Sequence, residues 1–419
     1  MVAALAAVTS RVPELPSVQP GSALRRLRRT RAAPDPRSTM TLTSAATAAA
    51  TTPAQGTRPP EAGSAVGTLD AARARSLEVE ARIAANPAEF RVLTGERPTG
   101  ALHIGHYFGT IANRVRLQQA GVEVFLILAD YQVITDRDEA GDLRATVREI
   151  LLDYLAAGID PDRTTVFTHS AVPALNQLLL PFLSLVSVAE LDRNPTVKAE
   201  TAATGGRAMS GLMLTYPVHQ AADILFCHGN LVPVGQDQLP HLETTRTIAR
   251  RFNQRYAAAS PYFPEPDALL APSPTILGTD GTKMSKSRGN TLPLGAGEDE
   301  TARWVKRART DAERAITYEP ETRPEVANLL TIASLCTGRT PEQVADEVGD
   351  AGAGRLKALV TEALVEHLRP IRARRAALAA GDGPDVLDLL ARGNARANEI
   401  ADRTLDDVRE LMGMVYRRG

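Results

Sequence analysis

The chain has 419 residues, 43 % of them hydrophobic, which is enough for a sizeable core and a second structural unit. Its formal net charge of -1 excludes a global attraction to nucleic acid or membranes, and the absence of an apolar run of roughly 18 residues excludes a membrane helix. The two cysteines lie far apart in sequence and argue against a disulfide framework or structural zinc, so we expect a soluble protein of a reducing compartment.

Residues 1–70 are rich in alanine, serine, threonine, proline and arginine, with few acids and no sustained periodicity. Such a composition cannot bury enough apolar surface to offset the entropy lost on ordering, so we predict a disordered N-terminal extension. The run LRRLRRTR (24–31) resembles an organellar transit peptide. The alternative is that translation starts downstream, for instance at Met40, and the sequence leaves both interpretations open.

Between residues 71 and 192 the pattern predicts alternating helices and strands. The continuous apolar run EVFLILAD (123–130) is typical of a strand covered on both faces of a parallel sheet. The predicted elements are helix 71–85, strand 91–95, helix 102–119, strand 123–130, helix 141–157, strand 164–170 and helices up to residue 192. This alternation predicts an α/β domain with a doubly wound parallel sheet. Because such sheets bind ligands beyond the carboxyl ends of their strands, we expect the loops after Thr94, Asp130 and Ser170 to face a site.

From residue 298 onward the sequence predicts helices and no convincing strand. The predicted helices are 300–315, 323–337, 340–349, 353–380, 384–393 and 395–417, several of them rich in arginine. We therefore expect an all-helical C-terminal domain over residues 298–419.

The stretch GERPTGALHIGHYFG (95–109) leads from a strand end into a helix whose first turn contains His103 and His106. Residues three apart share one helix face, so both imidazoles can project beside the helix N-terminus. The free N–H groups and the macrodipole at that end favour a phosphate, and Gly100 and Gly105 leave room for close approach. The pattern predicts a nucleotide pocket in which both histidines donate to ATP phosphates. The alternative is a pair of capping or surface histidines.

The loop GTKMSKSRGN (281–290) follows a strand-like segment, SPTIL (273–277), and contains two of only five lysines among 48 basic residues. Lysine carries a compact ammonium on a flexible stem, whereas arginine is a planar fork suited to fixed bidentate pairing. In a chain that otherwise uses arginine, Lys283 and Lys286 indicate a mobile loop whose point charges follow a leaving pyrophosphate. The alternative is a solvated surface loop.

HIGH at 103–106 and KMSKS at 283–287, in this order, are the paired signatures of class I aminoacyl-tRNA synthetases. Related nucleotidylyltransferases share HxGH but generally lack KMSKS. The segments LTYPVHQAADIL (214–225), LVPVGQDQLPHLETTRTIARRFN (231–253) and LRPIRARR (368–375) resemble the tryptophanyl-tRNA synthetases. The resemblance covers about residues 90–417. It implies a Rossmann-like catalytic domain over residues 71–297, a helical tRNA anticodon-binding domain over 298–419, and an enzyme that joins tryptophan to its tRNA.

The resemblance also implies roles for individual residues. Asp223 is expected to accept the indole N–H of tryptophan, and a carboxylate left without its donor rejects substrates that lack that N–H. The set implied for tryptophan is Asp223, Tyr216, Gln220, Gln238, Gln132 and Gly95. The set implied for ATP is Arg97, Pro98, Thr99, Gly105, His106, Gly235, Gln236, Asp237, Lys283, Met284, Ser285, Lys286 and Ser287. The set implied for catalysis is His103, His106, Lys283, Lys286 and Ser287, and Lys198 is expected in a loop near the pyrophosphate.

Three of these positions, Arg97, Gln132 and Gln220, differ from the residues that many family members carry there. Tyrosyl enzymes share the pattern YxxxQxxD (216–223), so tyrosine activation is an alternative, against which VGQDQ (234–238) argues. Such changes occur in a subset of bacterial tryptophanyl enzymes associated with tolerance of the antibiotic indolmycin, which leads to the hypothesis of a specialised, auxiliary paralogue. A non-catalytic paralogue is a further alternative, against which the intact HIGH and KMSKS argue.

The resemblance further implies ATP, with Mg²⁺ held mainly by ATP oxygens and water, so no dedicated set of metal ligands is expected. The expected partners are L-tryptophan, tRNA(Trp) and a second copy of the chain in a homodimer, with no membrane and no DNA. The expected location is the cytoplasm, and organellar targeting by the N-terminal extension is the alternative.

Overall fold

The structure is a computed structural model that describes residues 65–135, 141–203, 208–235, 238–270 and 275–416. The predicted extension lies outside the described residues except for 65–70, which open helix α1 (Ala65–Ala85). This helix therefore begins before its predicted start at residue 71. Residues 61–419 form one compact unit. Within the described residues no helix combines the length and apolar character that crossing a membrane requires.

A parallel sheet lies at the centre of this unit, as predicted. Its strands are β1 (Arg91–Glu96), β2 (Glu123–Leu128), β3 (Thr164–Thr168), β4 (Leu231–Val234) and β5 (Asp267–Leu270). The order across the sheet is β3-β2-β1-β4-β5, and all four pairings are parallel. The strand order reverses between β1 and β4, and the crevice beyond the carboxyl ends of such a pair is where sheets of this type bind ligands.

Helices cover both faces of the sheet, because alternate strand residues point to opposite sides. Phe125, Ile127 and Phe167 belong to one apolar cluster with residues of the helices 173–177, 211–225, 239–256 and 386–411. Leu126 and Val166 belong to a second cluster, which contains residues of the helix 143–157. The helices up to β5 are α2 (Ile104–His106), α3 (Ala112–Ala120), α4 (Leu143–Ala157), α5 (Pro173–Gln177), α6 (Leu179–Leu183), α7 (Val188–Arg193), α8 (Pro195–Ala203), α9 (Gly211–Leu225) and α10 (Leu239–Tyr256).

Two details of this half differ from the prediction. The helix expected over 102–119 is interrupted by a π-helical turn, Tyr107–Ile111, between α2 and α3, a feature that often accompanies functional sites. The fifth strand is Asp267–Leu270, not the segment 273–277. Of that segment the described residues contribute only an isolated bridge between Leu277 and Lys283, since the chain turns back at Gly278 and cannot continue a ladder.

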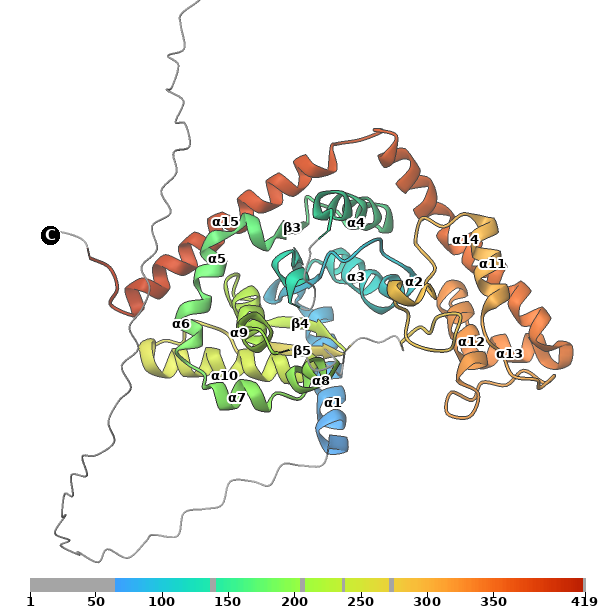
Figure 1. Cartoon of the computed structure of the whole chain (residues 1–419), viewed down its shortest axis with the longest axis horizontal. Helices are drawn as coiled ribbons and strands as arrows, with labels where there is room; N and C mark the ends of the chain where they lie inside the picture. Colours follow the sequence, from blue (N-terminus) through green and yellow to red (C-terminus); the bar gives the residue numbers. More distant parts are fainter. Residues whose placement is uncertain (1–64, 136–140, 204–207, 236–237, 271–274, 417–419) are drawn as a thin grey trace, which may run out of the picture. The chain divides into compact units, whose positions relative to one another are not determined.

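The C-terminal part is helical, and none of its described residues lies in a strand. Its helices are α11 (Glu298–Arg307), α12 (Pro324–Thr337), α13 (Pro341–Val348), α14 (Gly352–Ala379) and α15 (Val386–Leu411). The first helix ends at Arg307, before the predicted residue 315. The two helices predicted over 384–393 and 395–417 are the single helix α15 (Figure 1). Gly393 does not break α15; a Cβ there would lie 1.9 Å from the carbonyl oxygen of Val166, so glycine lets the helix pack directly on β3.

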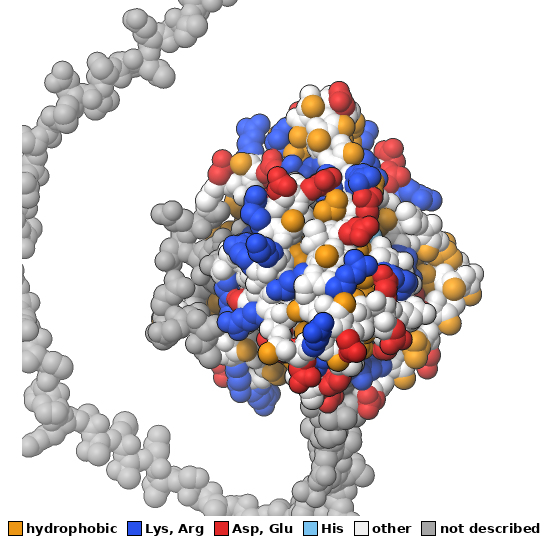
Figure 2. Space-filling view, turned by 90° about the vertical axis from the view of Figure 1, so that its right-hand side faces the viewer, with side chains coloured by type: hydrophobic (Ala, Val, Ile, Leu, Met, Phe, Trp, Pro, Cys, Tyr) orange, Lys and Arg blue, Asp and Glu red, His pale blue; other side chains and the backbone are white. Residues whose placement is uncertain are grey.

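The C-terminal helices share their core with the α/β part. Helix α14 packs along α4, and α15 packs on β3 and α5. Apolar residues of α4 and α11–α14 belong to one continuous cluster. The domain boundary at residue 298 stays a prediction, because this core crosses it. On the side of the molecule that Figure 2 displays, Lys and Arg side chains lie among Asp and Glu rather than forming one continuous basic patch.

Candidate active site

A pocket of about 340 Å³ opens at the point where the strand order reverses. This volume lies in the range of small-molecule sites. Its walls include the ends of β1 and β4, the turn after β2 and one face of α9. The six residues expected to contact the amino-acid substrate all line it: Gly95, Gln132, Tyr216, Gln220, Asp223 and Gln238. Tyr216, Gln220 and Asp223 project together because residues four and three positions apart share a helix face.

Gly95 lies where β1 meets the pocket. A Cβ at this position would lie 2.2 Å from the carbonyl oxygen of Ile127, so a side chain there would push β1 away from β2. Of the residues expected to contact ATP, Arg97 and Gly235 also line the pocket. Gln236 and Asp237 lie outside the described residues, as does the side chain of Ser287.

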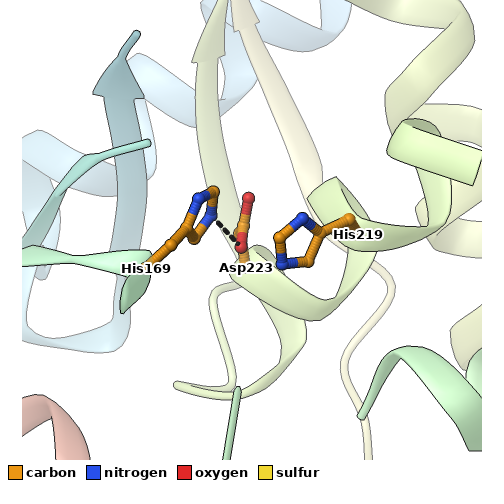
Figure 3. Close-up of side chains that lie close together, drawn as sticks. All are labelled: His169, His219 and Asp223. Carbon is orange, nitrogen blue, oxygen red and sulfur yellow. Dashed lines mark hydrogen bonds and ion pairs between the residues drawn. The ribbon is translucent and has the colours of Figure 1, made fainter. Parts of the chain in front are cut away.

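Asp223 is 5 % exposed and receives a hydrogen bond from a buried histidine that directly follows β3. His169 Nε2 lies 2.7 Å from Asp223 Oδ1, as Figure 3 shows. A second buried histidine, His219, stacks on His169 with the ring centroids 4.5 Å apart. His219 Nδ1 lies 3.0 Å from the amide nitrogen of Gln132. The polar residues that line the pocket are therefore supported by residues behind it. Tyr216 is instead held by another residue of the pocket wall, since its hydroxyl lies 3.1 Å from Nε2 of His241.

His169, His219 and Asp223 have ligand-type atoms within 4.8 Å of one another. They form a hydrogen-bond network, in which His169 Nε2, Asp223 Oδ1 and both ring nitrogens of His219 have partners. His169 Nδ1 is buried without a partner among the described residues. A metal ion would have to break these bonds before it could bind.

The HIGH segment forms a tight turn at the N-terminus of α2. The backbone N–H of His103 donates to His106 Nδ1 at 3.2 Å, so the ring proton of His106 sits on Nε2. The two rings stack with centroids 3.7 Å apart. His103 Nδ1 is buried without a hydrogen-bond partner among the described residues. His106 Nδ1 thus caps the start of α2, whereas His103 Nδ1 remains available to a ligand. A buried polar atom without a partner in the protein is expected to bind one.

The KMSKS loop lies against this turn, as expected of two segments that the resemblance assigns to one ATP site. Ile104 N donates to the carbonyl oxygen of Leu292 at 3.0 Å, and His103 forms an isolated bridge with Pro293. The ammonium nitrogen of Lys286 lies 3.2 Å from the point that a Cβ on Gly100 would occupy, so glycine lets this side chain approach. The loop brings basic charge to the histidines and to the start of α2.

Burial keeps both histidines of the HIGH turn neutral near pH 7. Burial first, and then the charges of His106 and Lys286, lower the pKa of His103 to about 3. Burial also lowers the pKa of His106, against the opposing effect of the Glu96 carboxylate. Neutral imidazoles can still donate one N–H to a phosphate, so the positive charge in this site comes from lysine and arginine.

By ¹⁵N NMR we expect the ring nitrogens of His103 to show no protonation between about pH 5 and 8, and those of His106 to titrate below the usual pH of about 6.5. The unfolded chain protonates His103 near pH 6.5, whereas the folded chain does so only near pH 3, so the unfolded state binds more protons between these values. The free energy of unfolding should therefore fall as the pH decreases through this window, and less steeply in His103→Gln. A titration of either ring near pH 6.5 would contradict the prediction.

An ion pair at the floor of the pocket was not predicted from the sequence. Glu96 accepts from Arg114 Nη1 at 2.9 Å and from the hydroxyl of Tyr154 at 2.6 Å. Arg114 is 2 % exposed. Burial by itself raises the pKa of Glu96, but Arg114, His106 and the Tyr154 hydroxyl together lower it below its usual range. Thr110 donates to the His106 carbonyl oxygen at 2.9 Å and lines the same pocket. The ion pair thus connects the amino-acid pocket to the HIGH turn. The sequence shows Glu96 and Arg114 as charged residues, but it does not show that they form a pair.

Asn290 was also missed, although it ends the quoted KMSKS stretch. Its side chain accepts from Ser285 N at 2.8 Å and donates to Asp280 Oδ1 at 2.8 Å, and its carbonyl oxygen accepts from Trp304 Nε1 at 3.0 Å. Asn290 is 2 % exposed. It therefore fastens both ends of the loop to α11.

Lys198 occupies a different setting from the predicted loop. It lies within helix α8, is exposed, and is not among the residues that line the pocket. The segment is helical because Val197 packs with Met213 and Tyr216. A role of Lys198 at the pyrophosphate stays a prediction.

Comparisons with known proteins agree with this geometry. Residues 85–369 match the family described as tRNA synthetases class I (W and Y). The chain is 40 % identical over 331 residues to the tryptophan–tRNA ligase of Gloeobacter violaceus, covering 78 % of this chain and 96 % of that protein. It is 40 % identical over 339 residues to the tryptophan–tRNA ligase of Treponema pallidum, covering 78 % and 98 %. The crystal structure of the Campylobacter jejuni tryptophanyl-tRNA synthetase with ADP and tryptophan matches with a TM-score of 0.65 at 28 % identity, covering 77 % of this chain and all of that one.

Proposed function

The chain belongs to the class I tRNA synthetases for tryptophan and tyrosine, and we propose that it acts as a tryptophan–tRNA ligase. It activates L-tryptophan with ATP to tryptophanyl-adenylate and pyrophosphate, and then transfers the tryptophanyl group to tRNA(Trp). The observation that carries this proposal is the pocket in which Asp223 presents a buried carboxylate, and whose wall includes Arg97 and Thr110, the residues that flank the HIGH segment on either side.

The pocket favours tryptophan because its polar residues suit an aromatic substrate with one N–H donor. Among the described residues Asp223 Oδ2 has no hydrogen-bond partner, and Oδ1 is held by His169. A substrate that fails to donate to this carboxylate leaves a buried charge unpaired, which is costly. Tyr216, on the same face of α9 as Asp223, and Gln238, directly before α10, would contact the α-amino group of the substrate.

In the first step an oxygen of the tryptophan carboxylate attacks the α-phosphorus of ATP, and the bond to pyrophosphate breaks. In the second step the 2′-hydroxyl of the terminal adenosine of the tRNA attacks the activated carbonyl carbon, and AMP leaves. Neither step forms a covalent bond to the enzyme. Such transfers depend on positioning and on stabilising the charge of the phosphates. His103 and His106 would donate to the phosphates, and Lys283 and Lys286 would bind the pyrophosphate.

The residues near the HIGH turn fit an ATP whose Mg²⁺ is bound by the nucleotide. The carboxylate of Glu96, whose charge acts on both histidines, already accepts from Arg114 and Tyr154, so it is not open to coordinate a metal. Phosphate oxygens and water would then supply the ligands, as Mg²⁺ commonly prefers. The ion would neutralise charge on the leaving pyrophosphate.

Replacing His106 by alanine should slow tryptophan-dependent ATP–pyrophosphate exchange by roughly 100-fold, because one preorganised N–H donor to the phosphates is lost. The thermal unfolding midpoint should change little, since His106 is only partly buried. An exchange rate equal to that of the unmodified enzyme would exclude His106 from the chemical step.

Aminoacylation of tRNA with tryptophan and with tyrosine, measured side by side, tests the proposed function as a whole. We expect charging of tRNA(Trp) with tryptophan and none of tRNA(Tyr) with tyrosine. Charging with tyrosine would favour the alternative drawn from YxxxQxxD (216–223). Absence of charging with either amino acid would favour a non-catalytic role.

The remaining proposals rest on the family alone. They are a homodimer, a cytoplasmic location, and anticodon binding by the helices after residue 298. On the face in Figure 2 basic and acidic side chains alternate, so tRNA contacts there would depend on individual arginines. The auxiliary, indolmycin-tolerant type, inferred from Arg97, Gln132 and Gln220, also stays a prediction.

A further inference from the structure

The two stacked histidines behind the pocket have no part in the proposed chemistry, and neither lines the pocket. His169 is fully buried and His219 is 4 % exposed. Each nevertheless contacts a residue that does line it: His169 contacts Asp223, and His219 contacts Gln132. Figure 3 shows both rings directed toward Asp223 from different elements, His169 from the turn after β3 and His219 from α9.

The hydrogen-bond partners determine where the protons lie in this pair. Asn176 Nδ2 donates to two backbone carbonyl oxygens, those of His169 at 2.8 Å and Val172 at 2.9 Å, so its Oδ1 is the acceptor side. Asn176 Oδ1 lies 2.8 Å from His219 Nε2, which must therefore carry the proton. His219 Nδ1 is then an acceptor and receives the amide N–H of Gln132 at 3.0 Å. Burial lowers the pKa of His219, which keeps this neutral form.

The proton position at His169 follows from its partner. An ionised carboxylate can only accept, so the His169 Nε2 that faces Asp223 Oδ1 at 2.7 Å is a donor. The ring of His169 cannot turn freely, because the ring of His219 stacks on it and the ring of Tyr131 lies parallel to it at 6.2 Å. The donor is thus fixed in place, and Asp223 is fixed through it.

We propose that His169 is a positioning residue for tryptophan specificity: its Nε2–H holds one oxygen of Asp223 so that the other oxygen points into the pocket and accepts the indole N–H. This inference rests on the proposed function and adds to it the group that orients the acceptor. Without the hydrogen bond the carboxylate could rotate or recruit water, and its preference for an N–H donor would weaken. His169 touches no substrate and acts only through Asp223.

The test compares His169→Gln with His169→Met. The two replacement side chains have similar length and volume, but only glutamine offers an N–H that can reach Asp223. For each variant, kcat/KM in ATP–pyrophosphate exchange is measured with tryptophan and with its analogue in which sulfur replaces the indole N–H. We expect His169→Met to reduce the preference for tryptophan over the analogue by about 10- to 100-fold, through the KM for tryptophan and not for ATP. His169→Gln should retain most of the preference.

An unchanged preference in His169→Met would overturn the inference, and a loss that is equal for both substrates would show a merely structural role. If His169→Met does not fold, ¹⁵N NMR of the unmodified protein decides: the His169 Nε2–H resonance should shift on adding tryptophan and not on adding the sulfur analogue. An identical response to both would also refute it. If the unmodified enzyme activates no tryptophan, the proposed function itself is wrong. This outcome is distinguishable from a failure of the His169 inference, which requires an active unmodified enzyme.

Discussion

Asp223→Ala is expected to reduce kcat/KM for tryptophan in ATP–pyrophosphate exchange by on the order of 1000-fold. The substitution removes the acceptor for the indole N–H and leaves the buried Nε2–H of His169 without its partner at 2.7 Å. The KM for ATP should change by less than about threefold, because the HIGH turn and KMSKS loop are untouched. Steady-state kinetics with each substrate varied in turn measure both effects.

Asp267→Ala is the matched control for this prediction. Asp267 is also a carboxylate paired with a cation, Arg75 at 3.0 Å, but it lies at the amino end of β5, opposite the pocket. Its replacement should leave tryptophan activation within about twofold of the unmodified enzyme. Equal effects of the two substitutions would mean that Asp223 acts through stability and does not recognise the substrate.

The double substitution of Lys283→Arg and Lys286→Arg should lower adenylation by about 100- to 1000-fold although the charge is conserved. The Lys286 ammonium lies in the narrow space beside Gly100, where a wider planar guanidinium cannot take the same position. Asn290 and Trp304 hold the loop that carries both lysines, so a wider head group cannot be accommodated by moving the loop outward. Single-turnover formation of the adenylate measures the effect directly.

Lys357→Arg provides the same chemical change away from the site. Lys357 lies on α14, and its ammonium donates to the carbonyl oxygen of Lys306 at 3.1 Å. We expect this variant to form the adenylate at a rate within about twofold of the unmodified enzyme. If the double variant also keeps its rate, the use of lysine in the loop has no catalytic meaning, and the argument from the scarcity of lysine is wrong.

Much of the architecture follows from local sequence. The run EVFLILAD predicted β2, and the alternation of apolar strands with helical spacing predicted a parallel sheet with helices on both faces. HIGH and KMSKS lie about 180 residues apart, and the family resemblance assigned both to one ATP site; His103 and Pro293, six residues after KMSKS, are bridged. These predictions succeeded because periodicity and short motifs are properties of neighbouring residues.

Other features depend on contacts that no local pattern contains. The sequence predicted two helices, 384–393 and 395–417, yet α15 continues through Gly393, where the helix packs on the backbone of β3. The predicted helical domain likewise shares its core with α4, since apolar faces from both parts bury each other.

The sequence by itself determined the sheet, the helical C-terminal part and the two motifs, because each is encoded in spacing along the chain. The residues that line the pocket were implied by the resemblance of the sequence to the family. Only the tertiary structure decided what supports those residues. His169 and Asp223 are 54 positions apart, and Gln132 and His219 are 87 apart, so their hydrogen bonds exist only after β3, α9 and the turn after β2 have packed together. A buried polar side chain takes its partner from whatever the fold brings within about 3 Å, which residue type alone does not specify.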